Sequence, residues 1–318
     1  MKILIAYDGS ASAHTAIDGL RRAGLPIEAD ALVVSVAEVW LPTPEHEASL
    51  NDAFPTEIPG LDRARAHAIE RMKLAEEAAR SACERVSQIF PQWQLRHQAL
   101  SGSPPHEILN LARQWEPDLI VVGSQGRTAL GRFVLGSVSQ KVLTEAQTSV
   151  RISRETIGTG GSAVRVVVGV DGSEGAKNAL RVVALRHWPP GSEVRVVIAE
   201  DPLVTNSAYR LIPPVDRFIA EVNEAEHGMA EKLATDAVKE LSATLKDKSV
   251  TVSSAVVTGV PKQALVAHAE EFGADCIFTG ATGLSNPIER FLVGSVSAAV
   301  AARAACSVEV VRLRNGSL

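Results

Sequence analysis

Short apolar runs and longer stretches with helical spacing alternate along the chain. Residues 2–7, the run ALVVSVAEV and the run DLIVVG are apolar nearly throughout, which is typical of strands buried on both faces of a parallel sheet. Residues 10–23, 61–89, 104–115 and 137–146 read as helices, and 93–100 and 149–154 as further strands. This alternation predicts an α/β fold: a doubly wound open sheet with right-handed crossovers and helices on both faces.

The pattern occurs twice. KILIAYDGS at 2–10 matches RVVVGVDGS at 165–173, LIVVGSQG at 119–126 matches CIFTGATG at 276–283, and RFVLGSVS at 132–139 matches RFLVGSVS at 290–297. Matched segments in the same order indicate a duplicated domain, because each copy is far longer than a solenoid unit. RETIGTGGSAV, residues 154–164, has the composition of a flexible linker. We therefore predict one domain at 1–153, a linker at 154–164 and a second domain at 165–318.

Charge, hydropathy and cysteine content limit the cellular location and the partners that the sequence predicts. The 318 residues carry a formal net charge of −5, which gives no electrostatic reason to seek nucleic acid or an anionic membrane surface. No apolar stretch approaches the ~20 residues that span a bilayer. The three cysteines, Cys83, Cys276 and Cys306, show no metal-ligand spacing and fit a reducing compartment. We expect a cytoplasmic protein that binds neither nucleic acid nor membrane.

The loop after the fourth apolar strand carries the sharpest chemical signal, GSQGRTALGRFVLGSVS from Gly123. Gly123 and Gly126 bracket a turn, and Gly136 opens the next helix. Residues without Cβ let backbone N–H groups approach a phosphate, and a helix N-terminus offers its positive end. Ser137 and Ser139 can add hydroxyl donors, although Ser137 can equally cap the helix. The loop lacks the lysine of a Walker A motif.

The spacing Gly-x2-Gly-x9-Gly-Ser, with a first strand that ends in Asp-Gly-Ser, resembles the ATP-binding branch of the universal stress protein family. The resemblance extends over both repeats and nearly the whole chain. It implies a Rossmann-like, five-stranded parallel sheet in each repeat, with nucleotide across the ends of strands 1, 2 and 4. Asp8 would lie beside the adenosine, and Val36 would offer backbone contacts to adenine. The ribose and phosphate contacts would come from Gly123, Gly126, Gly136, Ser137, Val138 and Ser139.

The second repeat keeps most of this pattern. Its corresponding residues are Asp171, Ile198, Gly280, Gly283, Gly294, Ser295, Val296 and Ser297. Ten residues, LSNPIERFLV, separate Gly283 from Gly294 where the first repeat has nine. Pro287 removes an N–H group and restricts this loop. We therefore expect the first site to bind nucleotide at least as well as the second.

The resemblance implies an ATP-binding regulatory protein of the stress response, with Mg²⁺ held mainly by the phosphates and by water. Only Asp8 and Asp171 recur as an acidic pair, and no arrangement of Ser, His and Asp or of metal ligands is evident. A dedicated hydrolase should show a general base or a group that positions water. A slow ATPase on the same fold, and a scaffold with degenerate sites, are the alternatives.

The closing strands, 149–153 and 307–312, are short and carry apolar residues. An unpaired apolar edge invites pairing with an equivalent edge, and one-domain members of the family resemble dimers joined through this strand. We predict that the two repeats pair here as an intramolecular pseudo-dimer, and leave open a larger homo-oligomer. The arginines Arg151, Arg154, Arg312 and Arg314 are interpreted as charges that discourage further strand addition.

Overall fold

The computed structural model describes residues 1–39, 61–125, 135–154, 162–201, 213–245, 249–281 and 294–312. Both repeats have the same order of elements. The first contains β1 (Lys2–Ala6), α1 (Ala11–Asp18), the 3-10 turn η1 (Gly19–Arg22), β2 (Asp30–Ala37), α3 (Leu61–Ile89), β3 (Gln94–Ser101), α4 (Pro104–Trp115), β4 (Leu119–Gly123), α5 (Ser137–Glu145) and β5 (Ser149–Ser153). The second contains β6 (Arg165–Gly169), α6 (Glu174–Leu185), β7 (Glu193–Glu200), α7 (Pro213–Leu245), β8 (Thr251–Thr258), α8 (Pro261–Phe272), β9 (Cys276–Gly280), α9 (Ser295–Arg303) and β10 (Ser307–Val311).

The strands form one sheet in the order β3-β2-β1-β4-β5-β10-β9-β6-β7-β8. Neighbours within each repeat are parallel, and β5 pairs with β10 in the antiparallel sense. The predicted doubly wound α/β fold is therefore confirmed, and the closing strands pair as the sequence indicated. The two five-stranded halves are continuous with each other.

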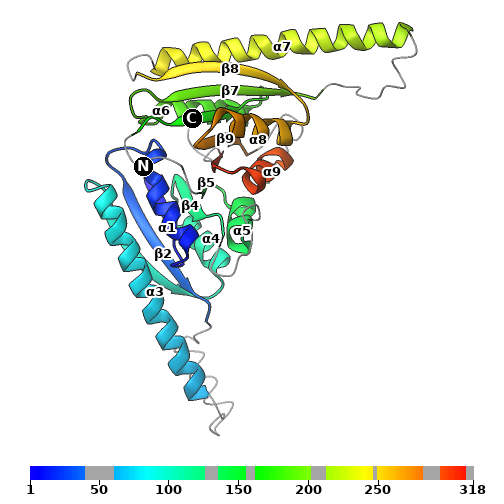
Figure 1. Ribbon diagram of the computed structural model, residues 1–318. Coiled ribbons are helices and arrows are strands. Elements are labelled where there is room, and N and C mark those ends of the chain that lie inside the picture. Colours follow the sequence, from blue (N-terminus) through cyan, green and yellow to red (C-terminus); the bar gives the residue numbers. More distant parts are fainter. Residues whose placement is uncertain are drawn as a thin grey trace.

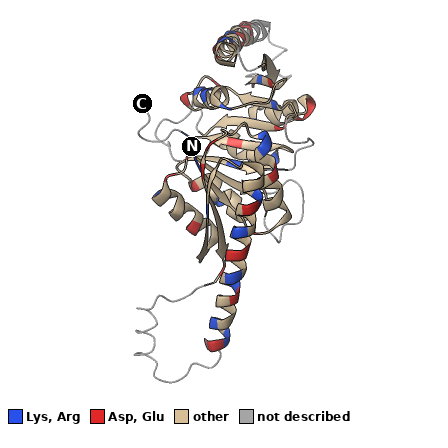
Figure 2. Ribbon diagram, turned by 90° about the vertical axis from the view of Figure 1, so that its left-hand side faces the viewer, with Lys and Arg blue, Asp and Glu red and all other residues tan. Residues whose placement is uncertain are grey.

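Helices cover both faces of this sheet (Figure 1). On one face lie α4, α5, α8 and α9, over a hydrophobic core that runs through both repeats and includes Leu4, Val150, Val167 and Val308. On the other face, α1 and α3 cover the first repeat, and α6 and α7 cover the second. Helices α3 and α7 lie toward opposite ends of the sheet, and acidic and basic residues intermingle along α3 (Figure 2).

Charged residues are buried at the junction of the repeats. Arg151 and Glu309 are both 0% exposed and lie opposite each other across the β5–β10 pair. Arg154 and Arg312 donate hydrogen bonds to main-chain carbonyls of the opposite repeat. The interpretation that Arg151, Arg154 and Arg312 are edge charges that discourage further strand addition is wrong, because the two edges pair with each other, bury Arg151 and Arg154 and half-bury Arg312. Arg314 lies outside the described residues.

Among the helices that the structure describes, none is long and apolar enough to cross a membrane.

Candidate functional site

The Asp-Gly-Ser motif builds the turn between the first strand and the first helix. Ser10 is the N-cap of α1, and its hydroxyl accepts a hydrogen bond from the N–H of Ala13 (3.1 Å). Asp8 Oδ1 accepts from the N–H of Ser10 (2.9 Å), while Gly9 takes a positive φ of 76° that suits glycine. The second repeat builds the same turn with Asp171, Gly172, Ser173 and Ala176. Each aspartate is thereby fixed at the end of a central strand.

The start of α5 presents free backbone donors. Gly136 is the N-cap, with φ −62° and ψ 154°, and none of the described side chains caps it. The first N–H groups of an α-helix have no intrahelical acceptor, so those of Ser137, Val138 and Ser139 are available to a ligand. The cap is thus Gly136, and the alternative of a capping Ser137 is not what the structure shows. Helix α9 begins in the same way at Gly294.

Ser139 uses its hydroxyl inside the protein. The hydroxyl donates to the carbonyl of Gly123 at 2.6 Å, and Ser297 donates to the carbonyl of Gly280 at 2.5 Å. The sequence suggested Ser139 as a hydroxyl donor to phosphate, but this bond commits the hydroxyl to the end of β4. Its role in the described structure is to hold the first turn of α5 against the strand.

Gly123 and Gly280 are required by the helix that follows the first strand of each repeat. A Cβ at Gly123 would lie 2.8 Å from Ser12 Oγ and 3.0 Å from the Ser12 carbonyl carbon. A Cβ at Gly280 would lie 2.3 Å from the carbonyl carbon of Gly175. The sequence interpretation assigned these glycines to the approach of a phosphate. The structure gives a second reason, which is that α1 and α6 pack directly against them.

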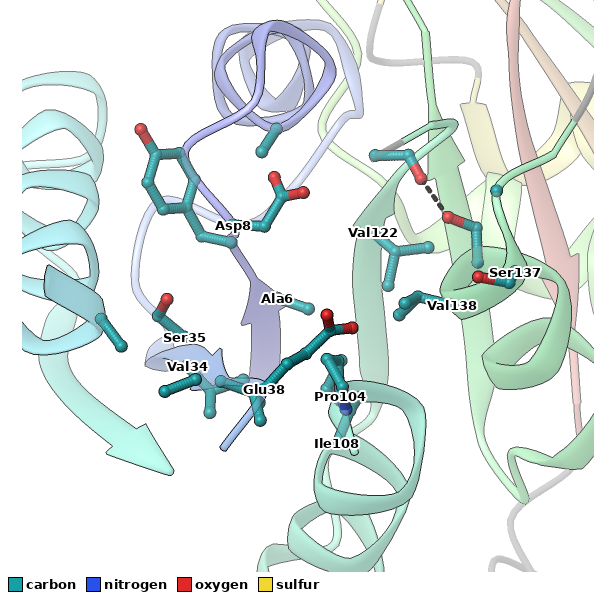
Figure 3. A pocket seen from close by; sticks show the side chains of 18 of the residues that line it. Ala6, Asp8, Val34, Ser35, Glu38, Pro104, Ile108, Val122, Ser137 and Val138 are labelled. Atoms are coloured by element: carbon teal, nitrogen blue, oxygen red, sulfur yellow. Dashed lines mark hydrogen bonds between the residues drawn. The ribbon is translucent and has the colours of Figure 1, made fainter. Parts of the chain in front are cut away.

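A pocket of ≈ 360 Å³ opens where these segments meet in the first repeat, a volume within the range of small-molecule sites. Figure 3 shows Asp8 at the end of β1, Val122 on β4, and Ser137 and Val138 at the start of α5 around this pocket. The sequence-predicted residues that line it are Asp8, Val36, Gly123, Gly136, Ser137, Val138 and Ser139. Gly126 lies outside the described residues.

The walls of this first pocket differ in chemistry. Its strand side is apolar, with Val34, Val122 and, from α4, Ile108. Its described charged residues are Asp8, Glu38 and Arg71. The α5 side presents the helix N-terminus, which is the positive end of the macrodipole. The pocket can therefore take a ligand with an apolar part at the strands and a negative part at α5.

A second pocket of ≈ 360 Å³ occupies the equivalent place in the second repeat. Of the predicted residues, it is lined by Asp171, Gly280, Gly294, Ser295, Val296 and Ser297. Gly283 lies outside the described residues.

The prediction that Ile198 belongs to the second site is wrong. Ile198 does not line the second pocket, whereas its neighbours Val197 and Ala199 do. Tyr7 N–H bonds to the Val34 carbonyl, and Val170 N–H bonds to the Val197 carbonyl. The counterpart of Val36 is therefore Ala199. Side chains alternate along a strand, so a slip of one residue directs Ile198 into the hydrophobic core on the other face.

Sequence reasoning missed several residues of the first pocket. Tyr7, directly after β1, lines it, with its hydroxyl 3.1 Å from the ring nitrogens of His14. Arg71 and Leu74 reach it from α3. Their spacing marks them as neighbours on one helix face, but only the packing of α3 shows that this face borders the pocket. In the second pocket, none of the described lining residues comes from α7.

Comparison with known proteins identifies the family of both repeats. The model of the universal stress protein family matches residues 1–154 and again residues 164–312. The chain belongs to the universal stress protein family. Universal stress protein Rv2005c of Mycobacterium tuberculosis is 30% identical over 211 residues, which are 62% of each chain. A universal stress protein of Thermus aquaticus is 31% identical over 158 residues, 48% of this chain and 97% of that one.

A solved structure supports the fold of the whole tandem chain. The crystal structure of a universal stress protein from Archaeoglobus fulgidus has a TM-score of 0.60 and covers 99% of this chain and 97% of that one. Its sequence identity is 20%, so the likeness concerns the fold alone. The matches cover between half and nearly all of the relatives' own lengths.

Proposed function

We propose that this universal stress protein binds ATP and acts as a nucleotide-dependent regulatory protein of the stress response in the cytoplasm. The observation that carries the proposal is the first turn of α5, whose free N–H groups border a pocket with Asp8 on its other side. The second repeat reproduces the arrangement with α9 and Asp171. A helix N-terminus favours phosphate, and the glycine spacing resembles that of ATP-binding family members.

The charges of the first pocket give the ligand a direction. Asp8 and Glu38 disfavour phosphate near the ends of β1 and β2, whereas the N-terminus of α5 favours it. We therefore place adenine against Val34 and Val36, the ribose beside Asp8, and the phosphates at Ser137 and Val138, with Gly126 as a further contact. Mg²⁺ would be held mainly by phosphate oxygens and water. Among the described residues, no group of three or more His, Cys, Asp or Glu could hold a metal ion.

The second site offers the same helix terminus with fewer charged neighbours. Asp171 is the one charged residue among its described lining residues, and the loop that leads to Gly294 contains Pro287 and one extra residue. We propose that this site, with Gly283 and Ala199 in the places of Gly126 and Val36, binds ATP no more tightly than the first.

One experiment distinguishes ATP binding from two other candidate functions, slow ATP hydrolysis and a scaffold without a working nucleotide site. The full-length protein is purified without nucleotide, denatured, and the released small molecules are chromatographed; a second sample is incubated with ATP and Mg²⁺. Released or newly bound ATP that stays intact supports the proposal. Steady accumulation of ADP would make the protein a slow ATPase instead. Absence of both bound nucleotide and ATP binding would leave a scaffold and contradict the proposal.

A further inference from the structure

At the β5–β10 junction, one residue of the first repeat lies opposite the equivalent residue of the second repeat. Ser149 pairs with Leu119, and Ser307 pairs with Cys276, so Arg151 and Glu309 are equivalent positions of the two repeats. The antiparallel register places these two residues opposite each other, with Val150 opposite Val310 and Ile152 opposite Val308. A local twofold axis therefore passes through the Arg151–Glu309 pair.

The charges of this pair are shielded from water. Arg151 and Glu309 are each 0% exposed, and Arg151 Nη1 lies 3.4 Å from Glu309 Oε2. Arg186, just after α6, contacts the other carboxylate oxygen. Charges in a site without water interact far more strongly than they do at a surface. If β5 paired with a second β5, or β10 with a second β10, the two residues on the axis would carry the same charge.

We propose that Arg151 and Glu309 form a pairing code that lets the edge of the first repeat accept only the edge of the second. Two first-repeat edges would bury two arginines against each other with no carboxylate between them. Two second-repeat edges would place two buried glutamates opposite each other, each accompanied by the Arg186 of its own repeat but without Arg151. The flanking valines and isoleucine are apolar in every combination and do not discriminate. The code permits pairing within one chain, or exchange of repeats between two chains. It disfavours both like pairings, and the arginine pair most, because Arg186 accompanies Glu309 but no carboxylate accompanies Arg151 in a pair of first-repeat edges.

Two charge reversals in the full-length chain test the code. Glu309→Arg gives both edges an arginine, and Arg151→Glu gives both edges a glutamate. We expect the wild type to unfold in a single cooperative transition, and each variant alone to lose it. When the two variants are refolded together, an edge with arginine can pair with an edge with glutamate only if the two edges belong to different chains. We therefore expect a heterodimer in a 1:1 ratio. Native mass spectrometry with one variant isotopically labelled identifies that species.

Arg151→Met serves as the matched control, because it removes the code while leaving Arg186 to neutralise Glu309. We expect this variant to remain a compact monomer. The proposal is overturned if either reversal alone keeps the wild-type transition. It is also overturned if a reversal forms homodimers, or if the mixture fails to form the heterodimer.

A different set of contacts links the two repeats to each other's pockets. Arg154, after β5, donates to the carbonyls of Ala301 (2.6 Å) and Cys306 (3.4 Å), at the end of α9. Arg312, after β10, donates to the carbonyls of Leu143 and Thr148, the latter at 3.4 Å, at the end of α5. Each arginine thus holds the C-terminus of a helix whose N-terminus lines the other repeat's pocket.

We infer that each repeat positions the phosphate-binding helix of the other, an inference that rests on the proposed function. Helix α5 has nine residues and is therefore only about 14 Å long. A rigid segment this short transmits a displacement of its C-terminus to its N-terminal turn. Arg312 and Arg154 are accordingly positioning residues that act from the opposite repeat.

The test is a crossed pair of substitutions, Arg312→Gln and Arg154→Gln, with ATP binding measured by calorimetry. The two sites are told apart by a second substitution, Ser295→Pro or Ser137→Pro, which weakens ATP binding at the other site by about tenfold or more. We expect Arg312→Gln to weaken the first site about three- to tenfold and to spare the second, with Arg154→Gln doing the reverse. An uncrossed pattern, or no change at either site, would overturn the inference.

Hydrogen exchange gives a readout that does not depend on nucleotide. Arg312→Gln should accelerate exchange of the α5 amides while leaving those of α9 unchanged, and Arg154→Gln should do the opposite. If the wild type binds no ATP, the proposed function fails, while the exchange pattern still decides the positioning role. Equal exchange in wild type and variants refutes that role.

Discussion

The hydroxyl of Ser139 donates a hydrogen bond of 2.6 Å to the carbonyl oxygen of Gly123. This bond ties the first turn of α5 to the last residue of β4. It therefore sets where the free N–H groups of that turn lie relative to the strand ends. Ser297 and Gly280 repeat it in the second half of the chain, so the relationship belongs to the construction of both pockets.

Ser139→Ala should lower the free energy of unfolding by about 1–2 kcal/mol, because the partly buried carbonyl of Gly123 loses a donor. It should also weaken ATP binding at the first site by roughly five- to tenfold, as the turn loosens. Urea unfolding and calorimetry measure the two effects. Thr144→Ala is the control, since the Thr144 hydroxyl also donates to a carbonyl, that of Gln140, but in an exposed setting. Equal effects of the two substitutions would contradict the prediction.

A series of Gly→Ala substitutions tests the close approach of helix and strand. Gly280→Ala should destabilise the most, by about 3 kcal/mol, because its Cβ would lie 2.3 Å from the Gly175 carbonyl carbon. Gly123→Ala should destabilise by about 1–2 kcal/mol, since its nearest contact would be the Ser12 hydroxyl at 2.8 Å. Gly228→Ala, which has nothing within 4 Å in the middle of α7, should stabilise by about 0.5–1 kcal/mol. Thermal unfolding ranks the three, and any other order speaks against this packing.

Glu309→Gln should lower the free energy of unfolding by about 3–5 kcal/mol, because it leaves the buried charges of Arg151 and Arg186 without their carboxylate. Asp18→Asn is the matched control. It breaks the exposed ion pair between Asp18 and Arg85, for which we expect a loss of about 0–1 kcal/mol. Denaturant titration compares the two. A loss for Glu309→Gln no larger than that of the control would show that the junction does not depend on this charge.

The buried Cys276 thiol should make the free energy of unfolding fall as the pH becomes alkaline. Burial raises its pKa to about 11 from an ordinary value of 9.0. The folded state therefore keeps the proton while the unfolded state releases it, so this contribution is complete below pH 9 and is lost as pH rises toward 11. The stability of the wild type should fall more steeply over this window than that of Cys276→Ala, by at most about 1.4 kcal/mol per pH unit. Denaturant titrations from pH 8 to 11 give the free energy of unfolding of both proteins. If it falls equally with pH in the wild type and in Cys276→Ala, this prediction is contradicted.

The regular part of the fold could be predicted from the sequence, because its periodicity is strong. The predicted helices at 61–89 and 104–115 coincide with α3 and α4. Apolar spacing marks α3, and two prolines mark the start of α4. The pairing of β5 with β10 was predicted from the apolar character of the two short closing strands together with the resemblance to one-domain family members that dimerise through this strand. The roles of Arg151, Arg154 and Arg312 could not be predicted in the same way. An arginine on an edge strand has the same sequence pattern whether water or a partner edge covers it.

The site shows a similar division. The Asp-Gly-Ser turn and the glycine at the start of α5 have local signals, and the structure brings Asp8 and Gly136 to one pocket. The contribution of Arg71 depends on how α3 packs, which no local pattern records. Ile198 was misplaced because a shift of one residue in a strand reverses the side-chain direction. The packing role of Gly123 was hidden because close approach to a helix and close approach to a phosphate both select glycine.

ATP binding by Ser137→Pro tests the central claim most directly. Proline is tolerated at the first position of a helix, and the ψ of 154° at Gly136 suits a residue that precedes proline, so the helix should persist while one N–H donor is lost. Ser137→Ala removes only the hydroxyl. By calorimetry we expect Ser137→Pro to weaken ATP binding at the first site by about tenfold or more, as for loss of a hydrogen bond to a charged group, and Ser137→Ala to stay close to wild type. Equal affinities of the two variants would contradict phosphate binding at the N-terminus of α5.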